Sequence, residues 1–207
     1  MTNIINQPNK SVLSLTLVRH GETDENVRGI IQGQSGSLLN AVGQQQVETL
    51  REVLRGETFD VMIASDLART MQTAHILNAV LALPLIAEPL LRERDWGTLT
   101  GVCVGEARAL KEMPDSVETV EAMGERARRF VGKLLADRAG QRVLAVTHGL
   151  FARCLQAVLL GVTIRDVPPM ENAEVRTLLI DEAMNVVGGS LVGEALASEA
   201  ADDVSDK

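Results

Sequence analysis

The feature of this sequence that most constrains its fold is an alternation of short apolar runs with longer segments whose apolar residues recur at helical spacing. Strands buried in a parallel sheet give such runs, and the helices that return the chain between them give the longer segments. We therefore predict an α/β fold with a mostly parallel sheet. The predicted strands are 13–18, 59–64, 85–91, 143–147, 175–180 and 186–192.

Polar residues before the helical segments predict where the helices begin, because their side-chain oxygens can accept from free amides. The expected cap residues are Asn40, Ser65 or Asp66, and the capping-box pair Asp115 and Glu118. The first two helices should reach about Leu54 and Val80. Pro84 and Pro89 favour an edge strand or a loop for 85–91, since proline cannot donate to a sheet ladder.

The length and charge of the chain limit the classes of protein to consider. With 207 residues it can form one domain with a substantial core, expected at 1–193, before an acidic tail at 194–207 that is predicted to be disordered. The net charge of −8 argues against partners such as nucleic acid or anionic membranes. Residues 1–12 lack a secretory signal, and the most apolar stretch, 79–87, is too short to span a bilayer. We therefore expect a cytoplasmic protein.

Three polar clusters interrupt the pattern, each where a predicted strand ends. They are Arg19-His20-Gly21-Glu22-Thr23, Ser65-Asp66-Leu67-Ala68-Arg69-Thr70 and Thr147-His148-Gly149. The carboxyl ends of parallel strands meet at one edge of an open sheet, which is where such proteins build their sites. We therefore expect two histidines and two arginines to converge at this edge.

This combination of side chains suits a phosphoryl group. Guanidinium groups bind its oxygens in pairs and neutralise the charge that spreads over them during transfer. A neutral histidine can be the nucleophile and form a phosphohistidine. The leaving oxygen then needs an acid, and Glu93, just after the third predicted strand, is the best-placed candidate, with Asp95 as its competitor.

Taken together, these motifs resemble those of the histidine phosphatase superfamily, in its phosphoglycerate mutase-like branch. They are RHGET-x-x-N, SDLxRT, RERxWG and THG, in this order along the chain. The resemblance extends from Leu13 to about Val192. It implies a three-layer α/β/α sandwich with a mainly parallel sheet of about six strands, and neither a metal nor another cofactor.

The resemblance also implies a role for each matching residue. His20 would be the phosphorylated nucleophile, and Glu93 would give a proton to the leaving group and then take one from water. The rest of the phosphate pocket would be Arg19, Arg69 and His148. Asn26 matches a phosphate-contacting position. The residues implied at the substrate side and its entrance are Thr23, Gln32, Gly33 and Arg94.

The sequence departs from the mutases of this family in ways that favour hydrolysis. Residues 102–105 lack the Lys that mutases place after Gly101, and the paired arginines with a proline run are absent around 113–116. The segment between Glu93 and His148 is also shorter than in true mutases. We therefore expect a phosphohydrolase for small phosphorylated metabolites. A phosphoglycerate mutase and a non-catalytic phosphate sensor are the alternatives, and a homodimer stays open.

The remaining motifs have simpler interpretations. His20, Glu22 and Asp24 alternate as metal ligands could, but no zinc-binding spacing accompanies them, so no metal site is predicted. Cys103 and Cys154 form no CxxC pair and are expected to be buried structural thiols. One basic cluster is expected to be a solvated helix face: Arg126, Arg128, Arg129 and Lys133.

Overall fold

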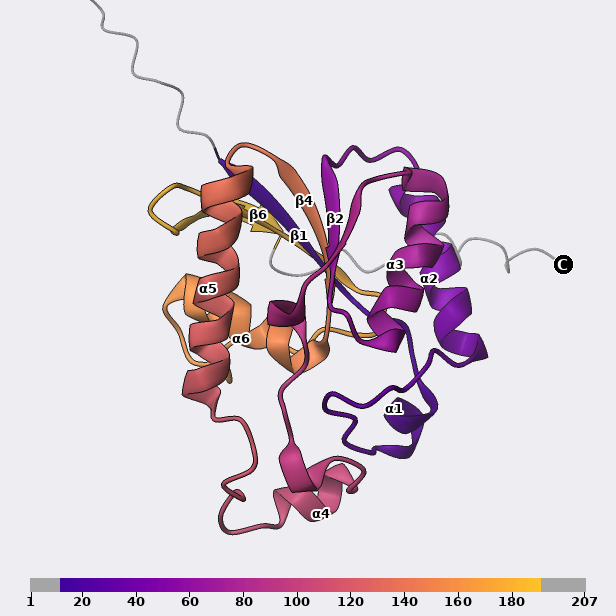
Figure 1. The fold of residues 1–207 in the computed structure, drawn as a ribbon, viewed down its shortest axis with the longest axis vertical. Coiled ribbons are helices and arrows are strands. Elements are labelled where there is room, and N and C mark those ends of the chain that lie inside the picture. Colours follow the sequence, from indigo (N-terminus) through magenta and orange to yellow (C-terminus); the bar gives the residue numbers. More distant parts are fainter. Residues whose placement is uncertain (1–11, 191–207) are drawn as a thin grey trace, which may run out of the picture.

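The computed structural model describes residues 12–190, which form one six-stranded sheet flanked by helices (Figure 1). The strands are β1 (Leu13–Arg19), β2 (Val61–Ala64), β3 (Leu85–Ala87), β4 (Arg142–Thr147), β5 (Val175–Ile180) and β6 (Val186–Ser190). Their order is β3-β2-β4-β1-β5-β6. The first four in this order are parallel to one another, whereas β5 and β6 pair antiparallel with their neighbours. The predicted mainly parallel α/β sheet is confirmed.

Helices lie in the connections between these strands, except in the short turn between β5 and β6. They are α1 (Asp24–Arg28), α2 (Ala41–Leu54), α3 (Ala68–Leu81), α4 (Val104–Arg108), α5 (Val120–Arg138) and α6 (Gly149–Leu160), with the 3-10 turns η1 (Pro89–Leu91) and η2 (Gly97–Leu99). The predicted cap of α2 is confirmed, because Asn40 Oδ1 accepts from the amide of Gly43 at 2.8 Å. Within residues 12–190, no helix is both long and apolar enough to cross a membrane.

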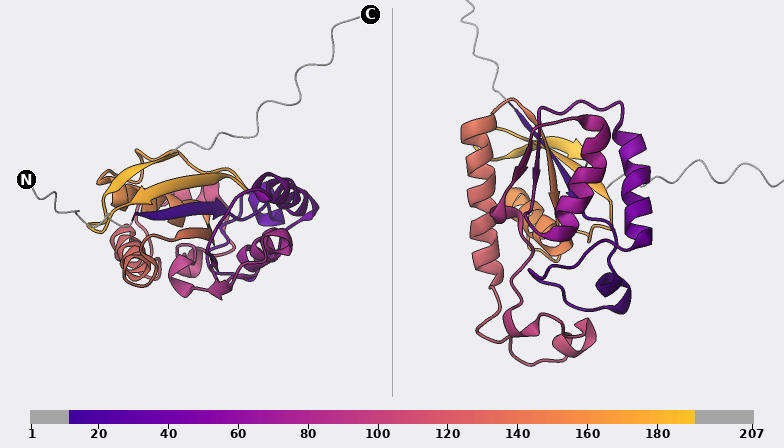
Figure 2. Two further views of the ribbon diagram at one scale, coloured as in Figure 1. Left: turned by 90° about the horizontal axis from the view of Figure 1, so that it is seen from above. Right: turned by 45° about the vertical axis from the view of Figure 1, so that its right-hand side comes forward.

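Alternate residues of the central strands face opposite helical layers, because side chains of a strand point to its two faces in turn. In β4, Val143 and Ala145 pack in the core formed with α5 and α6. Leu144 and Val146 face the opposite way, into the core formed with α2 and α3. The right-hand view of Figure 2 shows the sheet between these two helix pairs. The expected three-layer sandwich is therefore confirmed.

The predicted cap of α3 is wrong. The N-cap position is Leu67, which makes no side-chain cap bond. The Oγ of Ser65 is hydrogen-bonded to His148 Nε2 at 2.9 Å, and Asp66 forms an ion pair with Arg92. Both candidate cap residues therefore bond to partners that are distant in the sequence.

The predicted capping box before α5 is also wrong. The helix begins at Val120, and the Thr119 hydroxyl accepts from its first turn. Glu118 is instead the ion-pair partner of Arg126, at 2.8 Å. Asp115 lies in the segment before the helix and does not cap it.

The two ends of the predicted strand series have different outcomes. The segment 85–91 is an edge strand followed by a 3-10 turn, as its prolines predict. The last strand, β6, is described from Val186 to Ser190, and positions 191 and 192 of the predicted strand lie outside the described residues. The predicted acidic tail, 194–207, and with it the boundary at residue 193, lies outside the described residues.

A second, small core lies beyond the carboxyl ends of the parallel strands. Its side chains, here called the satellite cluster, are Ile31, Trp96, Leu99, Val102, Val104, Ala107 and Val117. The Ile31 amide donates to the Val102 carbonyl at 2.9 Å, which joins the segment 29–33 to the segment 96–117. Gly97 has φ +48°, and a Cβ there would lie 2.3 Å from the Ser116 carbonyl oxygen, so glycine is required.

The two cysteines differ in burial. Cys154 is buried in α6, as predicted, with 2% of its surface exposed. Cys103 is exposed beside the satellite cluster, where it is the N-cap residue of α4. The prediction that both thiols are buried is therefore wrong for Cys103, which lies in a connecting segment rather than in a core helix.

Candidate active site

A cavity of about 250 Å³ lies between the carboxyl ends of the strands and the satellite cluster. Its walls include the side chains of Arg19, His20, Arg69 and Glu93. His148 lies beside His20, with ring centroids 5.3 Å apart in an edge-on arrangement. The structure thus brings the five predicted catalytic residues to one edge of the sheet.

His20 follows β1 directly and is held in one tautomer. Its Nε2 accepts from Arg69 Nε at 3.2 Å, so the ring proton is on Nδ1, which donates to the Gly21 carbonyl at 2.7 Å. A Cβ at Gly21 would lie 2.5 Å from the Gly43 carbonyl oxygen, so glycine lets α2 approach this strand end. Burial, Arg69 and Arg19 hold the pKa of His20 well below its usual value. The imidazole is therefore neutral, with a lone pair on Nε2.

The two arginines of the cavity are held by backbone carbonyls. Arg69, in the first turn of α3, donates to the Gly33 carbonyl at 2.8 Å and to the Ser35 carbonyl at 3.2 Å. Burial lowers its pKa to about 10, so it is charged at neutral pH. Arg19 donates to the Met170 carbonyl at 2.7 Å, and its buried Nε has no partner among the described residues. That N–H is a donor free for an anion in the cavity.

His148 directly follows β4 and is fully buried behind the cavity. Its Nε2 bonds to Ser65 Oγ at 2.9 Å, and its buried Nδ1 has no hydrogen-bond partner within residues 12–190. Burial, followed by the charge of Arg69, holds the pKa of His148 well below its usual value. Ser65 is a site residue that sequence reasoning took for a helix cap. Its place in the SDLxRT motif, at the end of a strand, was the signal for this role.

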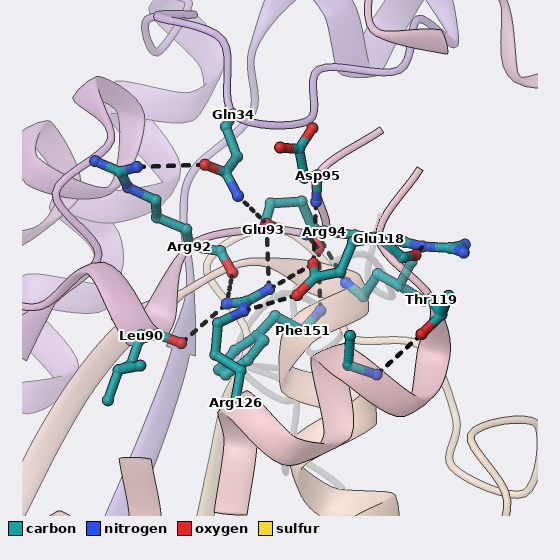
Figure 3. A network of polar contacts seen from close by, with 12 residues as sticks. Gln34, Leu90, Arg92, Glu93, Arg94, Asp95, Glu118, Thr119, Arg126 and Phe151 are labelled. Carbon is teal, nitrogen blue, oxygen red and sulfur yellow. Dashed lines mark hydrogen bonds and ion pairs between the residues drawn. The ribbon is translucent and has the colours of Figure 1, made fainter. Parts of the chain in front are cut away.

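Glu93 lies at the N-terminus of α6, as Figure 3 shows from close by. Its carboxylate accepts from the amides of Leu150 at 3.2 Å and Phe151 at 3.1 Å. It also accepts from the amide of Arg94 at 2.8 Å. Free amides at a helix N-terminus attract a carboxylate, so α6 fixes this side chain in the cavity wall.

The predicted substrate-side residues divide into two groups. Asn26, Gln32 and Gly33 line the cavity. Thr23 is fully buried and forms a capping box with Asn26 at the start of α1. Arg94 donates to the Glu118 carbonyl at 2.7 Å and stacks over the Trp96 ring at 4.6 Å. Thr23 and Arg94 are not among the described residues that line the cavity.

Two further positions support the site without a signal in the sequence. The Asn172 side-chain amide donates to the His20 carbonyl at 2.9 Å. Met170 lines the cavity and supplies the carbonyl that holds Arg19. Both lie between α6 and β5, where residues have no periodic pattern that would predict their positions.

The alternating His20, Glu22 and Asp24 do not form a ligand set. The Glu22 carboxylate accepts from Asn40 Nδ2 at 2.9 Å, and Asp24 is in the first turn of α1. Across the part of the chain that the structure describes, no three His, Cys, Asp or Glu side chains form a group that could hold a metal ion.

Comparisons with known proteins place this geometry in a family. A model of the histidine phosphatase superfamily (branch 1) matches residues 15–188. The probable phosphoglycerate mutase GpmB of Yersinia enterocolitica is 35% identical over 163 residues, which are 72% of this chain and 76% of that protein. The uncharacterized phosphatase PhoE of Bacillus subtilis is 32% identical over 152 residues, 72% of this chain and 78% of that protein.

The solved structures agree with the sequence matches. A mycobacterial glucosyl-3-phosphoglycerate phosphatase is similar with a TM-score of 0.74 and 26% identity, over 84% of this chain and 93% of that chain. A putative alpha-ribazole-5'-P phosphatase from Escherichia coli has a TM-score of 0.77 at 23% identity, over 87% of this chain and 96% of that chain. At that identity the second likeness concerns the fold alone.

Proposed function

Because the chain belongs to the histidine phosphatase superfamily, a superfamily of phosphatases and mutases, we propose that it hydrolyses small phosphomonoesters through a phosphohistidine on His20. The proposal rests on His20 Nε2. This nitrogen has no proton, carries a lone pair and lies 3.2 Å from the guanidinium nitrogen Nε of Arg69. A neutral imidazole can attack phosphorus, and the adjacent guanidinium can hold the phosphoryl oxygens.

In the first step, the Arg69 N–H that donates to His20 Nε2 would turn to a phosphoryl oxygen. His20 Nε2 would then attack the phosphorus while the bond from phosphorus to the leaving oxygen breaks. Arg19 Nε is a buried donor without a partner and can bind a phosphoryl oxygen. His148 Nδ1 can do the same when the Ser65 hydroxyl donates to Nε2 of that ring. Glu93, in protonated form, would give its proton to the leaving alcohol.

In the second step, water would attack the phosphorus of phosphohistidine. The Glu93 carboxylate would take a proton from that water while the bond from phosphorus to nitrogen breaks. Inorganic phosphate then leaves, and His20 returns to its neutral state. Every atom that moves in this scheme belongs to the substrate, water, His20 or Glu93, so the proposal includes no metal and no cofactor.

Trapping the intermediate tests this proposal. A brief reaction with a radiolabelled phosphomonoester should leave a protein label that is stable in alkali and labile in acid, as expected for a phosphohistidine. The label should be absent from His20→Ala, with turnover reduced at least about a thousandfold. Turnover should also survive a chelator. A His20→Ala variant with full turnover would overturn the proposal.

A second candidate is phosphoglycerate mutase, because a relative at 35% identity is named a probable one. It would use the same phosphohistidine but return the phosphoryl group to a second hydroxyl of the substrate. Conversion of 3- to 2-phosphoglycerate, dependent on 2,3-bisphosphoglycerate, is its assay. Release of inorganic phosphate without this conversion would eliminate it. A panel of small phosphorylated metabolites then identifies the leaving alcohol.

A further inference from the structure

We propose that Arg126 is a positioning residue for Glu93. Arg126 holds Glu93 in the cavity wall in two ways, through its ion pair with Glu118 and through hydrogen bonds to backbone carbonyls next to Glu93. Sequence reasoning placed Arg126 on a solvated helix face, and the structure contradicts this, since its side chain is only 14% exposed. The inference rests on the proposed role of Glu93 as proton donor and base.

The first support is the set of carbonyls that Arg126 binds. It donates to the carbonyls of Leu90 at 2.9 Å and Arg92 at 2.6 Å, and at 3.4 Å to that of Glu93 itself. One guanidinium thus ties together the backbone on the N-terminal side of Glu93 (Figure 3). These contacts come from α5, a helix on one face of the sheet, and reach the loop that carries the acid.

The second support is Glu118, whose two carboxylate oxygens each accept from one nitrogen on the same edge of the guanidinium. Arg126 Nε lies 2.9 Å from Oε1 and Nη2 lies 2.8 Å from Oε2, a paired geometry that fixes both groups. Glu118 Oε2 also accepts from the Asp95 amide at 3.1 Å, and the Glu118 amide donates to the Asp95 carbonyl at 2.8 Å. The pair therefore holds the backbone on the C-terminal side of Glu93 as well.

The third support links Arg126 to the groups that bind the carboxylate. Its guanidinium lies over the Phe151 ring, 4.5 Å from the ring centroid. The amide of Phe151 is one of those that donate to the Glu93 carboxylate. Arg126 thus contacts both the backbone of Glu93 and the residue that receives its side chain.

Arg126 is much less exposed than Arg128, a neighbouring arginine on the same helix. Arg128 pairs with Glu125, and these two side chains are 51% and 71% exposed. The Arg126–Glu118 pair is 14% and 15% exposed. Losing Arg126 would remove the charged partner of the half-buried Glu118 and the side-chain donor to the Leu90 and Arg92 carbonyls. Losing Arg128 would affect only groups that water already reaches.

An assay that varies the leaving group separates positioning from general damage. A dinitrophenolate ion leaves without a proton, whereas an alkyl alcohol needs one from the general acid. The ratio kcat/KM reports the step up to the first phosphoryl transfer. If Arg126 acts through Glu93, its loss should lower kcat/KM selectively for the substrate with the poor leaving group.

The experiment compares Arg126→Met with Arg128→Met, both as the full chain, on an alkyl phosphate and on dinitrophenyl phosphate. We expect Arg126→Met to lower kcat/KM for the alkyl phosphate by about 10- to 100-fold and for dinitrophenyl phosphate by less than about threefold. Arg126→Lys should fall between, because an ammonium group cannot pair with both Glu118 oxygens. Arg128→Met should match the wild type on both substrates.

Further variants keep the inference separate from the proposed function. Glu93→Gln should show the same leaving-group dependence, and adding Arg126→Met to it should not increase that dependence further. If Glu93→Gln shows none, the proposed role of Glu93 fails. If Glu93→Gln shows it but Arg126→Met lowers both substrates equally, only the positioning role fails. Should Arg126→Met not fold, Glu118→Gln carries the same test, with the same selectivity expected.

Discussion

One wall of the cavity is formed by residues at the ends of strands of the central sheet, whereas the opposite wall is formed by residues of the satellite cluster. His20 and His148 directly follow β1 and β4, which are hydrogen-bonded to neighbours on both sides. Trp96 and Val104 come from segments whose core consists of only a few side chains. We expect the histidines that follow the strands to act in phosphoryl transfer and the side chains of the satellite cluster to influence the choice of leaving alcohol.

In the comparison of the two walls, the largest expected effect is on the sheet side of the cavity. Arg69→Met removes the guanidinium beside His20 Nε2, which would stabilise the charge on the phosphoryl oxygens. We expect kcat/KM to fall by about 10²- to 10³-fold, or about 3–4 kcal/mol of transition-state stabilisation. Arg55→Met, at an exposed arginine just after α2, is the matched control and should retain wild-type activity. A fall of less than threefold for Arg69→Met would contradict the assignment.

The opposite wall supplies the contrast to this result. Trp96→Ala shortens a cavity-lining side chain of the satellite cluster without touching His20. We expect its effect to be an altered preference among substrates, seen as unequal changes in kcat/KM across a panel of phosphomonoesters. An equal change for every substrate would indicate that this wall also determines phosphoryl transfer.

The next effect concerns stability and compares one leucine in each core. Leu17, in β1, is fully buried in the large core, and Leu99 is 7% exposed in the satellite cluster. Leu17→Ala should lower the free energy of global unfolding by about 2–5 kcal/mol. We expect Leu99→Ala to weaken mainly the satellite cluster, because few contacts there depend on the sheet.

Hydrogen exchange and denaturant unfolding together measure this difference. In Leu99→Ala the amides of Gly101 and Val104, which donate to the carbonyls of Ile31 and Gly29, should lose protection. The midpoint of global unfolding should change far less than in Leu17→Ala. Equal losses of global stability in the two variants would mean that the two cores unfold as one unit.

The same contrast explains which parts of the fold could be predicted from the sequence. β1 and β4 are apolar runs because they are buried on both faces, and Asn40 caps its own helix, so local patterns suffice. The wrong cap of α3 has a long-range cause. Ser65 bonds to His148 across 83 positions of the chain, and no local pattern contains that partner.

The site divides in the same way. Residues that follow a strand, such as His20 and His148, could be placed because parallel strands end at one edge. Arg126 could not be separated from its basic neighbours by composition. The signal was its helical position, three residues after Met123 and four before Phe130, which are both buried. Asn172, in an irregular segment, had no such signal.

A smaller expected effect is a loss of stability at acid pH, caused by the two buried histidines on the sheet side of the cavity. His20 and His148 have pKa values well below the usual 6.5, chiefly through burial. As the pH falls below about 6.5, the unfolded chain takes up protons that the folded chain does not, so the free energy of unfolding decreases. Each histidine contributes up to about 1.4 kcal/mol per pH unit until its folded pKa is reached.

Urea unfolding at several pH values between about 7.5 and 5 measures this slope. His148→Gln should reduce the slope of the free energy of unfolding against pH by the contribution of one histidine. The segments of the satellite cluster contain no histidine, so the protection of their amides should not follow that slope. A wild-type free energy of unfolding that is constant over this range would contradict the buried, neutral state of both rings.

The last prediction concerns the reactivity of the two thiols rather than activity or stability. It compares a buried position in α6 with an exposed position beside the satellite cluster. Burial raises the pKa of Cys154 to about 11, and only the thiolate reacts with disulfide reagents, whereas Cys103 is exposed beside the satellite cluster. A chromogenic disulfide reagent should therefore modify Cys103 in the native protein and Cys154 only after denaturation. Cys103→Ser should abolish the native reaction, and Cys154→Ser should leave it intact. Reaction of both thiols at similar rates in the native protein would mean that α6 opens readily enough to expose Cys154.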